Sequence, residues 1–196
     1  MKNNSPTVNG YILAGGKSSR MGEDKGLILF NGKPMITHMI EQLKPAVKKI
    51  TIVSNNKAYE QFGLEVINDL IFDIGPAGGI LTALSHTNAD YNFICSCDMP
   101  FIKTEAINFL IQQSFDFEIT VAVDQDKIQP LFAVYSKSCL SEWKNQIQKN
   151  NFKLQELINH FNLQKLEMKN MKSFDEIIFT NVNSKSELEQ HQQKEK

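Results

Sequence analysis

The fold of this chain is decided by the run Leu13-Ala14-Gly15-Gly16-Lys17-Ser18-Ser19-Arg20-Met21-Gly22-Glu23-Asp24-Lys25. It continues an apolar, strand-like segment and opens a loop with two adjacent glycines. Glycine lets backbone N–H groups approach an anion without a Cβ in the way. Lys17, Arg20 and Lys25 add positive charge around the same loop. A strand followed by such a loop is typical of proteins that bind the phosphates of a nucleotide.

Two better-known phosphate loops do not fit this run. Gly16-Lys17-Ser18 resembles the end of G-x-x-x-x-G-K-[ST], but Tyr11 stands where that motif needs its first glycine. No G-x-G-x-x-G occurs in the chain, so the sequence does not support a Rossmann dinucleotide fingerprint. By itself, the run has a simpler alternative interpretation, namely a basic surface turn rich in glycine and serine.

Strand-like and helix-like segments alternate along the chain and predict a mainly parallel sheet covered on both faces. Predicted strands cover residues 11–13, 50–54, 65–67, 91–97, 118–123, 131–135 and 177–182. Predicted helices cover residues 34–43, 79–85, 104–113 and 139–160, with a break in the last one near residues 150–151. Thr104 is expected to cap its helix. The segment from Ser186 onward reads as a polar tail.

Composition indicates one globular domain over residues 1–196. The formal net charge of −1 lacks the basic excess of a general nucleic-acid-binding protein. No apolar run approaches the roughly 20 residues that a membrane helix needs. The three cysteines do not suggest a disulfide framework. We therefore expect a cytoplasmic protein with neither a nucleic-acid nor a membrane partner.

Asp98 is the next strongest signal, because it follows an apolar strand-like segment at residues 93–97. Ligands of open α/β sheets bind in the crevice outside the carboxyl ends of the strands. A carboxylate at that position suits Mg²⁺, which binds through few protein ligands and bridges to substrate phosphates. The alternative is that Asp98 only caps the turn before Met99-Pro100.

Several motifs together resemble the molybdenum cofactor guanylyltransferase (MobA) family. Residues 13–25 look like the L-A-G-G-x-S-x-R-M-G-x-D-K signature of that family. Further matches follow in the same order and span nearly the whole chain: Asn31-Gly32-Lys33-Pro34, Gly75-Pro76-Ala77-Gly78-Gly79-Ile80, Cys97-Asp98-Met99-Pro100, Gln129-Pro130-Leu131-Phe132-Ala133-Val134-Tyr135 and Asn181-Val182-Asn183. The resemblance implies an α/β fold of the nucleotide-diphosphosugar-transferase (Rossmann-like) type. Its nucleotide half would cover about residues 8–115 and its acceptor half about residues 116–185.

The resemblance also implies a reaction and its participants. GMP would pass from GTP to the molybdopterin cofactor with release of pyrophosphate, and Mg²⁺ would assist. Molybdoenzymes or cofactor-delivery proteins are the protein partners it suggests. Catalysis would fall to Arg20, Lys25 and Asp98, with Asp98 as the metal ligand. The implied nucleotide-binding residues are Leu13, Ala14, Gly15, Gly16, Lys25, Ser54, Asp69, Gly78 and Asp98.

The resemblance also assigns roles to two asparagines and to Asp69, and the chain differs from the usual family sequence at two positions. Asn181 and Asn183 would alternate on one face of a late strand, and the family's matching pair lies beside the acceptor or the metal. Asp69 offers an acceptor for the N–H donors of guanine, although a solvated turn residue is the alternative. Ser54 stands where the family often has asparagine, and Ala77 stands where it usually has leucine.

Three other functions compete with guanylyl transfer. A cytidylyltransferase for the same cofactor and a sugar-phosphate nucleotidyltransferase are the nearest. Cofactor cytidylyltransferases tend to show L-A-A-G and no aspartate before the lysine, so Gly15 and Asp24 favour guanine. A catalytically silent nucleotide-binding partner in cofactor assembly is the third. The presence of Arg20, Lys25 and Asp98 argues against it.

Overall fold

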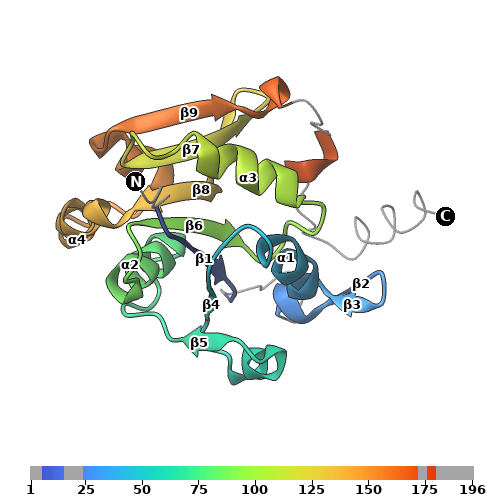
Figure 1. The fold of residues 1–196 in the computed structure, drawn as a ribbon. Coiled ribbons are helices and arrows are strands. Elements are labelled where there is room, and N and C mark those ends of the chain that lie inside the picture. The colour runs from blue at the N-terminus through green and yellow to red at the C-terminus, as the bar shows by residue number, and fades with distance from the viewer. Residues whose placement is uncertain (1–5, 16–23, 172–175, 180–196) are drawn as a thin grey trace, which may run out of the picture.

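A seven-stranded sheet forms the centre of the molecule (Figure 1). The computed structural model describes residues 6–15, 24–171 and 176–179 of the chain. The strand order is β5-β4-β1-β6-β8-β7-β9. Neighbouring strands from β5 to β6 are parallel, β8 is antiparallel to both β6 and β7, and β9 is parallel to β7. The mixed, mainly parallel sheet predicted from the sequence is therefore confirmed. The strands are β1 Val8–Leu13, β4 Ile50–Val53, β5 Glu65–Ile67, β6 Tyr91–Ser96, β7 Ile119–Asp124, β8 Lys127–Ser136 and β9 Leu163–Glu167.

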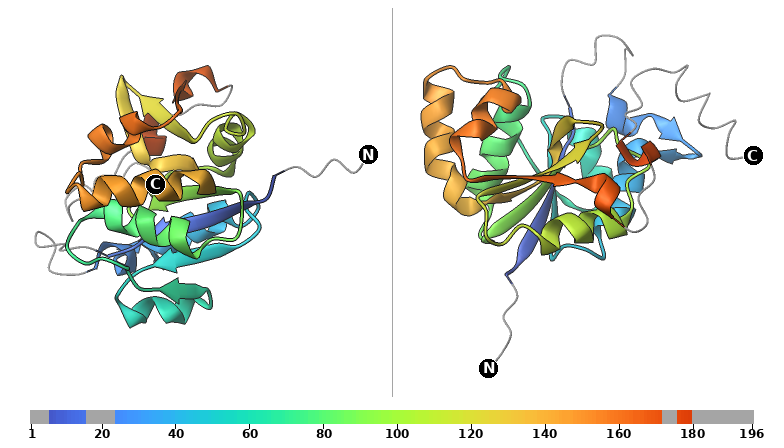
Figure 2. Two further views of the ribbon diagram at one scale, coloured as in Figure 1. Left: turned by 90° about the vertical axis from the view of Figure 1, so that its left-hand side faces the viewer. Right: turned by 90° about the horizontal axis from the view of Figure 1, so that it is seen from above.

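Helices cover both faces of this sheet (Figure 2). Alternation along β1 sends Tyr11 into the core beneath α2 and α4, and Ile12 into the core beneath α1 and α3. The helices are α1 Met35–Leu43, α2 Pro76–His86, α3 Thr104–Gln112, α4 Leu140–Gln148 and the short α5 Leu154–Leu157. In the described part of the chain, every helix is too short or too polar to cross a bilayer.

Short elements complete the fold. Two strands, β2 Leu29–Phe30 and β3 Lys33–Pro34, form a separate antiparallel pair. The 3-10 turns are η1 Lys25–Leu27, η2 Lys57–Phe62, η3 Lys137–Cys139, η4 Ile158–His160, η5 Met168–Asn170 and η6 Glu176–Phe179.

Two local predictions need correction, and one strand was missed. Residues 177–179 belong to η6 rather than to a strand, and residues 180–182 lie outside the described part of the chain. Lys103 is the N-cap residue of α3, while the Thr104 hydroxyl donates to the carbonyl oxygen of Gln42 at 2.9 Å and so ties α3 to α1. Strand β9 was not predicted, because its polar, half-buried sequence lacks the apolar pattern of the central strands.

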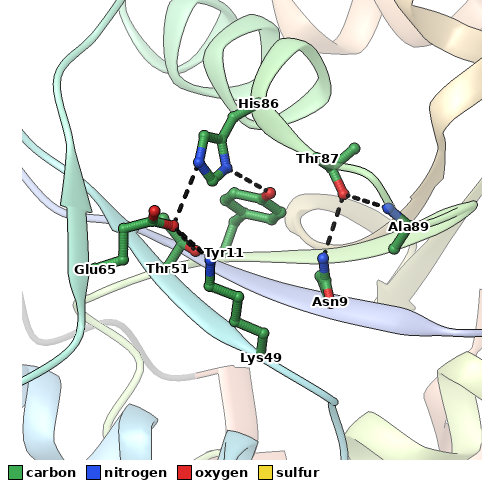
Figure 3. A network of polar contacts seen from close by, with 8 residues as sticks. All are labelled: Asn9, Tyr11, Lys49, Thr51, Glu65, His86, Thr87 and Ala89. Atoms are coloured by element: carbon green, nitrogen blue, oxygen red, sulfur yellow. Dashed lines mark hydrogen bonds and ion pairs between the residues drawn. The ribbon is translucent and has the colours of Figure 1, made fainter.

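The network in Figure 3 joins four elements around the imidazole of His86, the last residue of α2. Nδ1 of His86 shares a hydrogen bond of 3.0 Å with the Tyr11 hydroxyl of β1. Nε2 of His86 lies 3.3 Å from Oε2 of Glu65, the first residue of β5. The same Glu65 oxygen pairs with the Lys49 ammonium at 2.9 Å and accepts from the Thr51 hydroxyl of β4 at 3.0 Å. This network therefore fixes the end of α2 against three strands.

The Glu65 carboxylate should make the fold sensitive to acid. Its hydrogen bond with Lys49, with further contributions from Thr51 and His86, lowers the pKa of Glu65 in the folded chain. The stabilisation is complete above the unfolded-state pKa of about 4.3 and is lost as pH falls through the lower folded-state pKa. We predict that Glu65→Gln lowers the free energy of unfolding at pH 7 by about 0.5–1 kcal/mol.

Urea unfolding at pH 7 and at pH 3 checks this prediction. The difference between wild type and Glu65→Gln should shrink at pH 3, because protonation of the carboxylate, which removes its ion pairs, increases as pH falls toward the folded-state pKa. Glu60→Gln, which changes an exposed carboxylate on η2 outside the network, is the matched control. A difference that persists unchanged at pH 3 would show that the ion pairs are not its cause.

Candidate functional site

The site lies where four parallel strands end. The sheet ladder continues one residue beyond three of them: the Ala14 N–H donates to the Val53 carbonyl at 2.9 Å, and the Cys97 N–H donates to the Leu13 carbonyl at 3.2 Å. The Ser54 N–H likewise donates to the carbonyl oxygen at the end of β5, at 2.9 Å. Because β5 and β6 are three strand spacings apart, residues following them are separated by about 14 Å across the edge. Strand β1 ends between them.

A cavity of about 750 Å³ opens along this edge. Four residues predicted to bind nucleotide line it, namely Leu13, Ala14, Gly15 and Asp69. Gly15 has a φ of +123°, which a residue with a Cβ adopts only under strain. The complete lining is Leu13, Ala14, Gly15, Val53, Asn55, Asp69, Ile71, Phe72, Asp73, Gly75, Pro76, Gly79, Ser96 and Leu131.

Asp69 and Asn55 form the polar end of the cavity. The Asn55 Nδ2 donates to Oδ2 of Asp69 at 3.0 Å, and the Asp69 backbone N–H donates to Oδ1 of Asn55 at 3.0 Å. Burial raises the pKa of the Asp69 carboxyl, and the hydrogen bond from Asn55 acts in the opposite direction. The pair presents both carboxylate and amide groups to a polar ligand edge. Asn55 was not predicted as a site residue, although it follows a strand directly.

Ser54 and Gly78, two predicted nucleotide-binding residues, lie behind the cavity wall. Ser54 is 1 % exposed, and its Oγ accepts from the Asn56 backbone N–H at 3.2 Å. A Cβ on Gly78 would lie 2.9 Å from the carbonyl oxygen of Ile71, so this glycine allows a loop to pack on α2. At this edge the cavity is lined by Asn55, Gly75 and Gly79.

Lys25 and Asp98 meet at the other end of the site. The Lys25 Nζ donates to Oδ2 of Asp98 at 3.2 Å, although 73 positions separate the two residues. The Ser96 hydroxyl donates to Oδ1 of the same carboxylate at 2.5 Å. The side chain of Asp98 is 14 % exposed. The structure thus brings two of the three predicted catalytic residues together.

A second cavity of about 570 Å³ adjoins the first. Both cavities are lined by Pro76, Ser96 and Leu131, and Asp98 belongs to the second one. Its walls combine apolar and polar side chains: Pro76, Ser96, Asp98, Met99, Gln129, Pro130, Leu131, Phe152, Lys153, Leu154, Gln155 and Glu156. Asp98 therefore stands close to the place where two ligands in adjoining cavities would meet.

A single carboxylate at Asp98 suits Mg²⁺ better than a metal ion that needs several protein ligands. Within the residues that the structure describes, no group of three or more His, Cys, Asp or Glu side chains could hold a metal ion. Mg²⁺ is commonly bound through one or two carboxylates while phosphates and water supply the rest. Four predicted site residues lie outside the described part of the chain: Gly16, Arg20, Asn181 and Asn183.

Asp24, which precedes Lys25 in the chain, is itself fixed by hydrogen bonds to its carboxylate. The Tyr59 hydroxyl donates to Oδ1 of Asp24, and the Asn56 Nδ2 donates to Oδ2 at 3.0 Å. The Gly26 backbone N–H also donates to Oδ1, at 3.3 Å. Burial, with Cys97 and Asp24 nearby, raises the pKa of Tyr59 above its ordinary value, so the hydroxyl stays protonated and remains a donor. We call these contacts the Asp24 anchor.

Comparisons with known proteins agree with this geometry. Residues 10–165 match the model of the MobA-like NTP transferase domain. The chain is 40 % identical over 183 residues to a probable molybdenum cofactor guanylyltransferase of Flavobacterium johnsoniae, covering 93 % of this chain and 95 % of that protein. It is 40 % identical over 144 residues to the molybdenum cofactor guanylyltransferase of Shewanella piezotolerans, covering 70 % and 71 % respectively.

A solved structure shares the fold. The molybdopterin-guanine dinucleotide biosynthesis protein A of Archaeoglobus fulgidus superimposes with a TM-score of 0.81 and 24 % sequence identity. The superposition covers 94 % of this chain and 97 % of the other. With a family match over most of the sheet and a site at its carboxyl edge, the chain belongs to the MobA-like NTP transferase family.

Proposed function

We propose that this protein transfers GMP from GTP to the molybdopterin cofactor, with release of pyrophosphate, and so forms the guanine dinucleotide cofactor. The observation that carries the proposal is the pair of adjoining cavities with Lys25 and Asp98 beside their junction. Such a pair can hold a donor and an acceptor at once. The names of the relatives, molybdenum cofactor guanylyltransferases, support a guanine nucleotide as donor and the molybdenum cofactor as acceptor.

In this proposal the donor lies along the carboxyl edge of the sheet. The guanine edge meets Asp69 and Asn55, because their oxygens can accept from the N1–H and the 2-amino group. The phosphates lie toward Gly15 and Lys25, where a backbone turn and an ammonium group favour anions. Gly16 and Arg20 would extend this phosphate site.

The reaction needs positioning and charge neutralisation more than proton transfer. An oxygen of the acceptor's terminal phosphate attacks the α-phosphorus of GTP, and the bond from that phosphorus to the β-phosphate oxygen breaks. The attacking phosphate is largely ionised at pH 7, since the second pKa of a phosphomonoester is about 6. Lys25 and Arg20 would offset the charge of the leaving pyrophosphate. Mg²⁺ held by Asp98 would neutralise further charge when bound.

The acceptor would occupy the second cavity. Pro130, Leu131 and Phe152 offer apolar walls to a flat pterin ring, while Lys153 offers a cation to a phosphate. Asn181 and Asn183 would add amide groups on the acceptor side.

All three cysteines are buried free thiols, which suits a reducing compartment such as the cytoplasm. A molybdoenzyme or a delivery protein would then receive the product.

Donor choice tests the proposal against the competing functions. We expect purified protein with molybdopterin cofactor and Mg²⁺ to release pyrophosphate with GTP and far less with CTP, ATP or UTP. Each buried polar group that a mismatched base leaves unpaired costs about 1–3 kcal/mol. A preference for CTP would indicate a cytidylyltransferase. Nucleotide binding without any pyrophosphate release would indicate a silent binding partner.

Asp98→Asn should abolish most turnover while the fold remains intact. The amide preserves the shape of the side chain but removes the charge that would hold Mg²⁺ against the phosphates. We expect a loss of about 10²-fold or more in the rate of GMP transfer, comparable to removing one electrostatic contact from a transition state. Asp90→Asn, which changes an exposed carboxylate just before the other end of β6, is the control. Near-full turnover of Asp98→Asn at saturating Mg²⁺ would rule out this metal site.

The Asp24 anchor should affect catalysis through Lys25. Tyr59→Phe removes one donor to Asp24, and a hydrogen bond to a charged group contributes about 1.5–3 kcal/mol. We expect kcat to fall roughly tenfold as Lys25 loses its position. Tyr91→Phe removes the hydroxyl of a half-buried tyrosine that donates to the Phe115 carbonyl oxygen away from the site, and it should leave kcat unchanged.

The two tyrosine variants are compared by kcat, KM for GTP and thermal unfolding. A general loss of stability would lower activity in both variants to the same extent. The anchor is supported only if Tyr59→Phe loses activity at a temperature where both variants remain folded.

A further inference from the structure

An apolar loop lies exposed beside the nucleotide cavity. Leu70, Ile71 and Phe72 follow β5 and are 59 %, 39 % and 63 % exposed. Ile71 and Phe72 line the 750 Å³ cavity, whereas Leu70 is not part of its lining. Neither the reaction chemistry nor the polar contacts above explain an aromatic ring at this position.

The loop is held at its base. Asp69 exchanges two hydrogen bonds with Asn55, and the Leu70 backbone N–H donates to Oγ1 of Thr82 in α2 at 2.9 Å. The carbonyl oxygen of Ile71 packs where a Cβ on Gly78 would otherwise stand. Phe72 therefore projects from an anchored turn and belongs to the wall of a defined cavity.

The polar groups in the same cavity indicate what Phe72 contacts. Asp69 and Asn55 can satisfy the edge of a base, but a base also has two flat apolar faces. Aromatic side chains bind such faces by stacking, largely independently of the groups on the edge. We propose that Phe72, with Ile71 beside it, forms the surface on which the purine ring of the donor nucleotide lies.

This contact would separate purines from pyrimidines by ring size. A two-ring base covers more of an aromatic surface than a one-ring base does, so it gains more from Phe72. Asp69 would act differently, because it distinguishes bases by their edge groups. The inference deepens the proposed function and rests on a nucleoside triphosphate being the donor.

Binding measurements separate the two contributions without any turnover. Titration calorimetry without acceptor would compare GTP, ITP, which lacks the 2-amino group, and CTP. Phe72→Ala should raise the Kd for GTP and for ITP by about 5- to 30-fold each, and the Kd for CTP by less. Asp69→Asn should instead weaken GTP more than ITP. Phe72→Trp should retain GTP binding, because it keeps an aromatic face.

Leu70→Ala is the matched control, since it truncates a similarly exposed side chain of the same loop outside the cavity lining. It should leave all three Kd values within about twofold, the usual range for a surface change. Thermal unfolding of each variant checks that the fold is retained. The exposure of Phe72 makes a large loss of stability unexpected.

A tryptophan reporter gives an independent readout. The chain has one tryptophan, Trp143, which is fully buried beneath α2. Because Trp143 is buried and does not line the cavity, a change on adding GTP would report on the introduced tryptophan. GTP should change the fluorescence of Phe72→Trp strongly, since position 72 lines the cavity, and that of Leu70→Trp weakly. Unchanged GTP affinity in Phe72→Ala would overturn the stacking proposal while leaving guanylyl transfer intact. A wild-type protein that binds none of the three nucleotides would overturn both.

Discussion

Parallel pairing on both sides of β1 is the constraint on which the site depends. Its backbone is fixed by β4 on one side and by β6 on the other, and the ladder continues past the strand ends to Ala14 and Cys97. The glycine-rich loop therefore starts from a rigid position at the middle of the carboxyl edge. Asp98 follows β6, the neighbour of β1 on one side, and Asp69 follows β5, which lies beyond β4 on the other side. No single segment of the chain could place these three groups together.

Helix α2 links the two edges of the sheet. It begins at the cavity with Pro76 and ends in the His86 network on the opposite side (Figures 1 and 3). Its buried residues also carry the packing of the loop that holds Phe72, through Gly78 and Thr82. The contacts of Gly78 and Thr82 therefore help to shape the 750 Å³ cavity, whereas the His86 network fixes the far end of the helix.

Charge at the site is arranged locally. The whole chain is nearly neutral, with a formal net charge of −1. The anion binding that we propose would therefore depend on individual cations such as Lys25, whose neighbour Asp24 is held by Tyr59 and Asn56. The resemblance to cofactor guanylyltransferases suggested Asp24 as a marker for guanine. In the structure, the Asp24 carboxylate accepts a hydrogen bond from Tyr59 of η2, while the adjacent Lys25 side chain pairs with Asp98.

Local pattern in the sequence was enough to predict the sheet type and the positions of Gly15, Asp69 and Asp98 close to strand ends. Parallel strands align their carboxyl ends, so residues that follow them gather at one edge whatever their separation along the chain. The positions of Asn55, Tyr59 and Phe72 were decided only by tertiary structure, because their surroundings combine separate elements of the chain. The same reason explains why Ser54 and Gly78 lie behind the wall. Whether a side chain lines a cavity or is packed behind its wall depends on neighbouring elements, which the local sequence does not specify.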